Sequence, residues 1–235
     1  MPKRAVIAIG GNSLIPDADH VTVQDQYRAA GETDDHIARL IRDGWDVAIT
    51  HGNGPQVGFI LRRSELAAHE LHEVPLDVCG ADSQGAIGYA LQQNLVNDFR
   101  QMGIEKCVVT VVTQVVVDEK DPAFENYNKP IGPFLSRAEA ERRRDDWGWQ
   151  NREDSARRGW RRLVASPKPL RVIQRHMIRD TTRAGHIVVA CGGGGIPIRV
   201  TEDGRYEGIE AVVDKDLTSS VLACDVKAEL LIILT

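Results

Sequence analysis

Five short runs rich in Val and Ile recur along the chain, and most are separated by segments with apolar residues at helical spacing. The runs cover residues 5–9, 46–50, 107–117, 187–190 and 230–235. Strands that alternate with helices are typical of an open α/β sheet, in which helices cover the strands. The run "CVVTVVTQVVV" at 107–117 is almost without polar residues, and this predicts one central strand covered on both faces.

Turn and helix signals divide the rest of the chain. Apolar residues at helical spacing follow the first run until Asp43-Gly44, which predicts the end of a helix there. A second helix is expected to begin near Pro55, because proline suits a first helical turn. A third is expected from about residue 82 to 102, ending at Gly103.

Residues 118–168 interrupt this alternation with proline-rich loops and an arginine-rich helix. We interpret them as a protruding subdomain inserted into a single domain that spans 1–235. The last run, "AELLIILT", has no polar tail after it, and we expect the domain to be incomplete at this end.

The composition is that of an ordinary globular chain. With 235 residues and 42% hydrophobic content, it can bury roughly 70% of its unfolded surface. No run is long enough to span a membrane and no signal-peptide core follows Met1, so a cytoplasmic location is expected. The four cysteines form no C-x-x-C pair and are expected to be small, buried, reduced thiols. They are Cys79, Cys107, Cys191 and Cys224.

Charge is distributed unevenly. Residues 137–183 hold thirteen arginines and one lysine against seven acidic residues, although the net charge of the whole chain is -5. Three of the four tryptophans also lie there, so a nucleic-acid face is one interpretation. A positive rim that attracts a phosphorylated substrate is another. Because the arginines alternate with Glu and Asp, the favoured interpretation is a solvated helix and loop.

Two strand ends carry similar glycine turns. Gly10, Gly11 and Asn12 follow the first run, and Gly52, Asn53 and Gly54 follow the second in "THGNGPQVG". Either turn alone could be a plain tight turn. Two such turns at the carboxyl edge of a parallel sheet can converge, and their N–H groups would then hold a small anion. Neither G-x-G-x-x-G nor a P-loop is present.

A third glycine run, "CGGGGIPI" at 191–198, follows the fourth apolar run and leads to an expected hairpin across Asp203-Gly204. Four consecutive glycines carry a large entropic cost on folding, and here they are flanked by apolar residues. We therefore expect a backbone cradle for phosphates. Its residues are Gly192, Gly193, Gly194 and Gly195.

Two lysines are candidate phosphate contacts. Asp214 is expected to cap a helix whose first turn holds Lys215 and Asp216. A cation at the positive end of a helix dipole needs a compensating anion, either a neighbouring carboxylate or a bound phosphate. Lys129, in the protruding segment, is the second candidate.

Two other patterns are weak. His69 and His72 are three residues apart, but no third ligand is near, so no metal site is expected. Ser83-Gln84-Gly85 lacks the G-x-S-x-G pattern of a nucleophile elbow.

Taken together, eight segments closely resemble the carbamate kinase family of the amino acid kinase superfamily. They are "GGNSL", "THGNGPQVG", "LDVCGADSQGAIGYALQQ", "TQVVVDEKDPAF", "NKPIGPF", "GWRRLVASPKP", "VVACGGGGIPI" and "EAVVDKDL". The resemblance runs in order along nearly the whole chain. It differs at Ser13, Asp82 and Tyr127-Asn128, where the family has other residues, and at the end, where the family continues with an adenine-binding segment.

The resemblance implies an αβα sandwich with a mainly parallel sheet, the amino acid kinase fold, acting as a homodimer. It implies reversible phosphoryl transfer between ATP and carbamate, giving ADP and carbamoyl phosphate, with Mg²⁺ on the nucleotide and a place in arginine fermentation. No nucleic acid or membrane partner is implied. Alternatives are another acylphosphate-forming kinase of the superfamily, or an inactive or dimerising fragment.

The resemblance also implies roles for the candidate residues. The two glycine turns would hold the carbamoyl and phosphoryl groups. Lys129 would reach in from the protruding loop, Lys215 would neutralise charge on the phosphoryl group, and Asp216 would orient both lysines.

Overall fold

The computed structural model of the protein describes residues 3–11 and 22–234. Its main sheet has the strand order β12-β1-β2-β9-β3, and each neighbouring pair is parallel. The expected mainly parallel α/β sheet is therefore confirmed. Its strands are β1 (Lys3–Ile9), β2 (Trp45–His51), β3 (Val108–Thr110), β9 (Ile187–Val189) and β12 (Leu230–Ile233).

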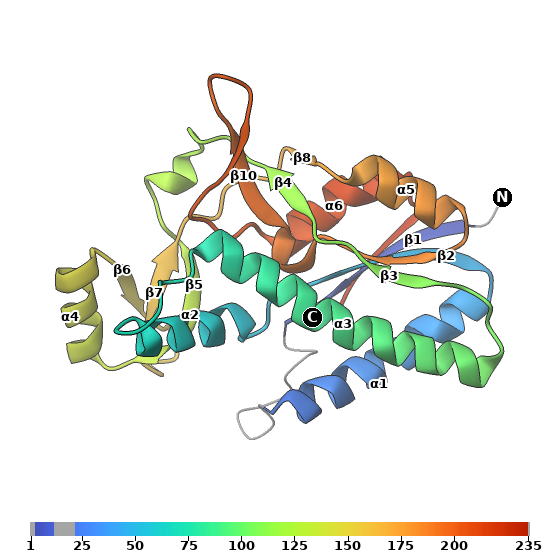
Figure 1. Cartoon of the computed structure of the whole chain (residues 1–235), viewed down its shortest axis with the longest axis horizontal. Coiled ribbons are helices and arrows are strands. Elements are labelled where there is room, and N and C mark those ends of the chain that lie inside the picture. Colours follow the sequence, from blue (N-terminus) through green and yellow to red (C-terminus); the bar gives the residue numbers. More distant parts are fainter. Residues whose placement is uncertain (1–2, 12–21, 235) are drawn as a thin grey trace.

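Helices cover both faces of this sheet (Figure 1). On one face lie α1 (Val23–Arg42) and α3 (Leu76–Met102), and on the other lie α5 (Arg175–Arg183) and α6 (Lys215–Val226). Side chains alternate along each strand, so Ile7 packs with α1 and α3 while Val6 packs with α5 and α6. This is the αβα sandwich that the sequence resemblance implies.

The ends of the helices follow local signals. Thr22 and Asp25 form a capping box at the start of α1, and the helix stops at Asp43, before Gly44 with φ +95°. Helix α2 (Gln56–Ala67) begins directly after Pro55, as expected. Helix α3 ends at Gly103, as expected, but begins at Leu76, six residues earlier than the sequence suggested.

The expected single strand over 107–117 is wrong. The run divides into β3, the last strand in the order of the main sheet, and β4 (Gln114–Val116), in a second sheet. Between them the Gln84 amide accepts from the Thr113 N–H (2.8 Å) and donates to the Thr113 carbonyl (3.1 Å). The Thr113 carbonyl also accepts from the Ile196 N–H of the second sheet at 2.9 Å. The buried Gln84 side chain therefore takes the place of a strand partner for the Thr113 N–H, at the point where the chain changes sheets.

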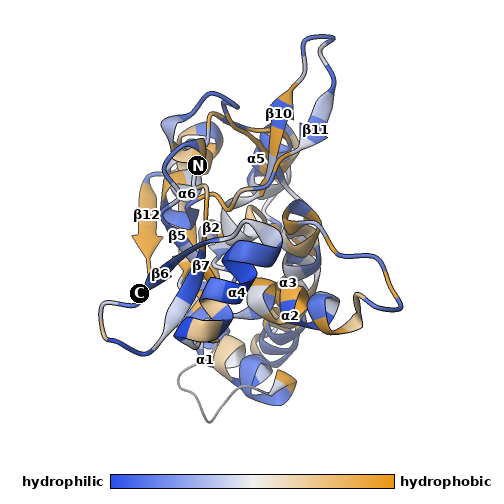
Figure 2. Ribbon diagram, turned by 90° about the vertical axis from the view of Figure 1, so that its left-hand side faces the viewer, coloured by the Kyte–Doolittle hydropathy of each residue, from blue (hydrophilic) through white to orange (hydrophobic). Residues whose placement is uncertain are grey.

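The second sheet has the order β11-β10-β4-β8. Its strands, besides β4, are β8 (Arg171–Val172), β10 (Ile196–Val200) and β11 (Tyr206–Gly208). Strands β10 and β11 form the predicted antiparallel hairpin across Asp203-Gly204. Figure 2 shows this hairpin projecting from the body of the molecule.

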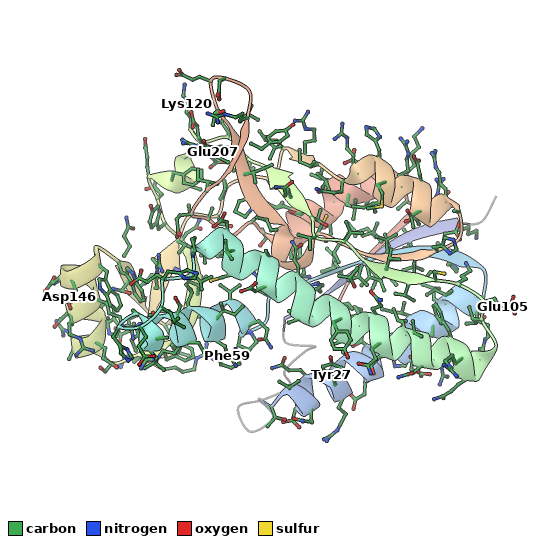
Figure 3. The ribbon with its side chains drawn as sticks, viewed as in Figure 1. Tyr27, Phe59, Glu105, Lys120, Asp146 and Glu207 are labelled. Carbon is green, nitrogen blue, oxygen red and sulfur yellow. The ribbon has the colours of Figure 1, made fainter. Side chains whose placement is uncertain are left out.

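A third, antiparallel sheet lies at one end of the molecule (Figure 1). It has the order β5-β7-β6 and carries α4. These elements are η2 (Pro122–Phe124), β5 (Lys129–Leu135), α4 (Arg137–Trp147), β6 (Gln150–Glu153) and β7 (Trp160–Val164). All of them lie within 118–168, and we refer to them as the β5–β7 lobe. Asp146 on α4 is at the outer end of this lobe (Figure 3).

Helix α4 is mostly solvated, as the mixed charges of its sequence favour, and it is strongly hydrophilic in Figure 2. Its buried residues are Ala140 and Arg143, and Arg143 pairs with Glu65 on α2 at 3.1 Å. Its guanidinium also lies over the Trp147 and Trp149 rings. Part of the arginine and tryptophan enrichment therefore joins the lobe to α2.

All four cysteines are free thiols, but the expectation of burial is right only for Cys79 and Cys191, because Cys107 and Cys224 are exposed. In the part of the chain that the structure describes, no helix combines the length and apolar character needed to cross a membrane.

Candidate active site

The glycine turns after β1 and β2 touch each other. Gly52 N–H donates to the Ile9 carbonyl at 2.9 Å. A Cβ on Gly11 would lie 3.1 Å from the Cα and N of Gly54, and a Cβ on Gly52 would lie 3.0 Å from the N of Gly11. Any larger residue would push the turns apart, so glycine is required for their approach. The expected convergence is present, while Asn12 lies outside the described residues.

The tetraglycine turn, which includes η3 (Gly192–Gly194), meets the same place from β9. Gly193 has φ +65°, and a Cβ there would overlap the Asn53 side-chain amide. The other three glycines pack against protein groups: Gly192 against His51 and Gln84, Gly194 against the Val213 backbone, and Gly195 against Val115. Gly193 is therefore the member of this run that faces the cavity described below.

The N-terminus of α6 supplies charge. Asp214 caps the helix, as predicted, by accepting from the N–H groups of Asp216 (2.9 Å) and Leu217 (3.3 Å). Lys215 Nζ lies 2.6 Å from Asp216 Oδ1. Lys129 Nζ, at the start of β5, lies 3.0 Å from Asp214 Oδ2. Each lysine thus has its own carboxylate, and Asp214 takes the place that the resemblance gives to Asp216 beside Lys129.

These elements enclose a cavity of about 570 Å³. It brings together nine of the candidate residues: Gly11, Gly52, Asn53, Gly54, Lys129, Gly193, Asp214, Lys215 and Asp216. Phe59 of α2, labelled in Figure 3, forms part of its wall. Gly10, directly after β1, is buried and does not line the cavity.

The cavity has a positive balance. Three of its lining residues are cationic, Lys129, Arg161 and Lys215, against two carboxylates. Partial burial alone would raise the pKa of Asp214, but the hydrogen bond and charge of Lys129, with the helix N–H groups, hold it below its usual value. Asp214 therefore stays ionised beside Lys129, and the remaining positive charge suits an anionic ligand.

Arg161 is a cavity residue that the sequence analysis did not single out. Its Nε is buried and has no hydrogen-bond partner among the described residues, and its guanidinium lies 5.5 Å from the Phe134 ring centroid. Arg161 belongs to the "GWRR" segment, but the sequence does not indicate which of the two arginines of this segment faces the cavity.

Two buried polar residues behind the glycine turns were also missed. Burial lowers the pKa of His51 to about 4, despite its hydrogen bond to Gly52, so the ring is neutral near pH 7. Its Nδ1 therefore donates to the Gly52 carbonyl at 2.9 Å. Gln84 donates to the Gly192 carbonyl at 3.0 Å as well as to Thr113. Both residues support turns rather than line the cavity.

The arrangement can bind and orient a phosphoryl group. Backbone N–H groups at strand ends and lysine side chains stabilise phosphate charge, and in-line phosphoryl transfer needs positioning and charge stabilisation above all. Within residues 3–11 and 22–234, no group of three or more His, Cys, Asp or Glu side chains is arranged to hold a metal ion.

Known proteins are similar to this chain in sequence and in structure. The model of the amino acid kinase family matches residues 3–235. A carbamate kinase of Pyrococcus horikoshii is 48% identical over 238 residues, covering 100% of this chain and 75% of the relative. The structure of carbamate kinase from Giardia lamblia bound to citric acid superposes with a TM-score of 0.93 at 38% identity, covering 100% of this chain and 75% of that one. The same enzyme bound to AMP-PNP gives 0.90 at 39% identity, covering 100% and 74%.

Proposed function

The chain belongs to the amino acid kinase family, in which it groups with the carbamate kinases, and we propose that it transfers a phosphoryl group reversibly between ATP and carbamate. In the direction of ATP synthesis, the bond between phosphorus and the carbamate oxygen of carbamoyl phosphate breaks. A terminal phosphate oxygen of ADP forms the new bond, and carbamate leaves.

One observation carries this proposal: two touching glycine turns and two lysines from separate parts of the chain face one cavity. Carbamate is a small planar anion without a side chain, so recognition has to come from backbone N–H groups and charge. The cavity offers these groups, and transfer by direct displacement needs no covalent intermediate on the protein.

The roles of the residues follow from their places. We propose that Lys215, at the start of α6, neutralises charge on the phosphoryl group, and that Lys129 contacts the same group from β5. Gly11 and Gly54 let the group approach the main chain. Gly10, Asn12 and Gly52 shape the same turns, and Asn53 contributes its amide. Gly192, Gly194 and Gly195 support the turn from which Gly193 faces the ligand.

ATP and ADP are the proposed nucleotides, supported by the AMP-PNP held in the Giardia lamblia structure. We propose that Mg²⁺ binds with the nucleotide, where it offsets charge on the phosphates. Mg²⁺ is commonly held by one or two carboxylates and by substrate phosphates. Of the two carboxylates at the cavity wall, Asp214 already accepts from the α6 N–H groups and from Lys129, so Asp216 is the one that fits that donor set.

The wider setting is also proposed. We propose a cytoplasmic homodimer that serves arginine and carbamoyl phosphate metabolism, with residues 118–168 as the subdomain inserted into a single kinase domain. The sequence resemblance supports these points, and the position of Lys129 in the β5–β7 lobe supports a functional role for the subdomain.

The test is an assay of ATP formation by the full-length protein from ADP and carbamoyl phosphate, with ATP measured by a coupled enzyme. Acetylglutamate and aspartate are tested in parallel as phosphoryl acceptors from ATP. Turnover with carbamoyl phosphate and none with the two amino acid acceptors is expected. Turnover with either amino acid acceptor alone would assign the protein to another kinase of the family.

A further inference from the structure

Ser83 lies on α3, and its side chain is buried beneath the second glycine turn. Its Oγ is 2.8 Å from Asn53 Oδ1 and 2.8 Å from the Gly80 carbonyl oxygen. The sequence gives Ser83 no role as a nucleophile. The structure instead connects it to an amide that lines the cavity.

A serine hydroxyl has one proton for these two acceptors. Gly80 lies inside α3, where its carbonyl has the N–H of the residue four positions later as its ordinary partner. Asn53 Oδ1 has no other hydrogen-bond partner among the described residues. The Ser83 hydroxyl therefore donates its proton to Asn53 Oδ1, and the contact with the Gly80 carbonyl helps to fix the position of Ser83 Oγ.

The hydrogen bond also decides which way the Asn53 amide points. Asn53 Oδ1 accepts from Ser83, and Asn53 Nδ2 makes no hydrogen bond to the described residues. Gly193 packs against the same amide, and a Cβ there would overlap it. The amide is therefore held from two sides, and its free N–H groups are left for a ligand.

We propose that Ser83 is a positioning residue that fixes the Asn53 amide with Nδ2 toward the phosphoryl oxygens of carbamoyl phosphate. This inference rests on the proposed function. An amide turned the other way would present Oδ1 to an anion, and the contact would be repulsive. Ser83 therefore acts through Asn53 and does not itself touch the substrate.

The experiment is a double-mutant cycle in the full-length protein, with kcat/KM for carbamoyl phosphate as the readout. Removing a donor to the transition state costs on the order of 100-fold, which is expected for Asn53→Ala. Ser83→Ala should cost roughly 10-fold, the value of one hydrogen bond. The double variant should be no slower than Asn53→Ala, because Ser83 has nothing left to position. Losses that multiply would overturn the proposal, and so would an unchanged Ser83→Ala.

Two further variants separate positioning from stability. Ser83→Cys replaces the hydroxyl by a slightly larger thiol, which is a weak donor. Its kcat/KM should therefore fall between those of the wild type and Ser83→Ala, and a value at or below that of Ser83→Ala would contradict the proposal. Ser220→Ala, at an exposed serine of α6, is the matched control and should leave kcat/KM unchanged. The KM for ADP should stay constant throughout.

The wild-type rate distinguishes the two ideas. If the wild-type protein makes no ATP from carbamoyl phosphate, the proposed function fails. If it is active and the cycle is additive, only the role of Ser83 fails.

Discussion

Lys215 occupies a position where its charge is unfavourable without compensation. It lies in the first turn of α6, where the helix dipole is positive, and its side chain is only 15% exposed. Asp216 and the capping Asp214 supply the compensating negative charge. A bound phosphoryl group would supply more, at the point where charge develops during transfer. The residue is thus arranged to act on phosphate charge, and its carboxylate neighbours keep it in place.

At the same scale, Gly11→Ala should lower kcat/KM for carbamoyl phosphate at least ~10-fold with little change in Tm. The new Cβ would lie 3.1 Å from backbone atoms of Gly54, so the two turns must separate by a few tenths of an ångström. Steady-state kinetics and thermal unfolding measure the two effects.

Gly85→Ala is the matched control, because a Cβ at this exposed position of α3 meets no atom within 4 Å. Its kinetics should be those of the wild type, with stability raised by about 1 kcal/mol from helix propensity. If Gly11→Ala instead unfolds the protein, Gly11 is required for the fold and its role in catalysis is unsupported.

At the scale of elements, α3 supplies side chains that hold two of the three glycine turns. Ser83 holds Asn53 in the second glycine turn, and the adjacent Gln84 holds Gly192 in the third. Gln84 also binds both backbone groups of Thr113, where the chain leaves the main sheet. One buried turn of helix therefore fixes the relative positions of two strand ends.

Gln84→Met should accordingly destabilise the protein by about 1–3 kcal/mol, because it leaves the buried Thr113 N–H unpaired. The carbonyls of Thr113 and Gly192 keep backbone partners, the N–H groups of Ile196 and Gly195. Urea unfolding followed by circular dichroism measures the loss. The exposed Gln93 on the same helix is the control, and Gln93→Met should change the free energy of unfolding by less than about 0.5 kcal/mol. Equal effects of the two substitutions would show that the Gln84 hydrogen bonds contribute nothing specific.

The packing of α1 on α3 contains a buried carboxyl group. Asp34 is fully buried, and within the described residues neither of its oxygens has a hydrogen-bond partner. Burial, and secondarily the charge of Asp98, raises its pKa to about 9. The group is therefore protonated in the folded protein near pH 7 and ionised in the unfolded chain.

The pKa difference of Asp34 between the folded and unfolded states makes the stability of the protein depend on pH. Between the unfolded pKa near 4 and the folded pKa near 9, the folded state binds one more proton, so this group lowers stability as pH rises through that window. Asp34→Asn removes the effect. Its Tm advantage over the wild type should grow from pH 5 to pH 8 and level off above about 9. An advantage that is constant with pH would mean that Asp34 is not protonated in the folded state.

Across the whole molecule, alternation of apolar runs and helices predicted the parallel sheet, and glycine turns at neighbouring strand ends predicted a common site. Those features are local in the sequence. The division of 107–117 was not predictable in this way, because it depends on Gln84, whose partners lie 29 and 108 residues away along the chain. The inward direction of Arg161 likewise depends on how the β5–β7 lobe meets the main sheet.

The ion pairs of the cavity were likewise only partly predictable from the sequence. The sequence identified Lys129, Asp214, Lys215 and Asp216, but the pairing of Lys129 with Asp214 joins residues 85 positions apart. That contact links the β5–β7 lobe to the start of α6. The cavity thus forms only in the folded molecule, where the β5–β7 lobe contributes Lys129 and α6 contributes Lys215.

The central claim is that this cavity stabilises a phosphoryl group during transfer, and kcat of Lys215→Ala tests it most directly. In the full-length protein, ATP synthesis from ADP and carbamoyl phosphate should fall on the order of 100-fold in kcat, with a much smaller change in KM and an unchanged fold by circular dichroism. A loss confined to kcat means that Lys215 acts on the transition state. A kcat equal to that of the wild type would contradict the account.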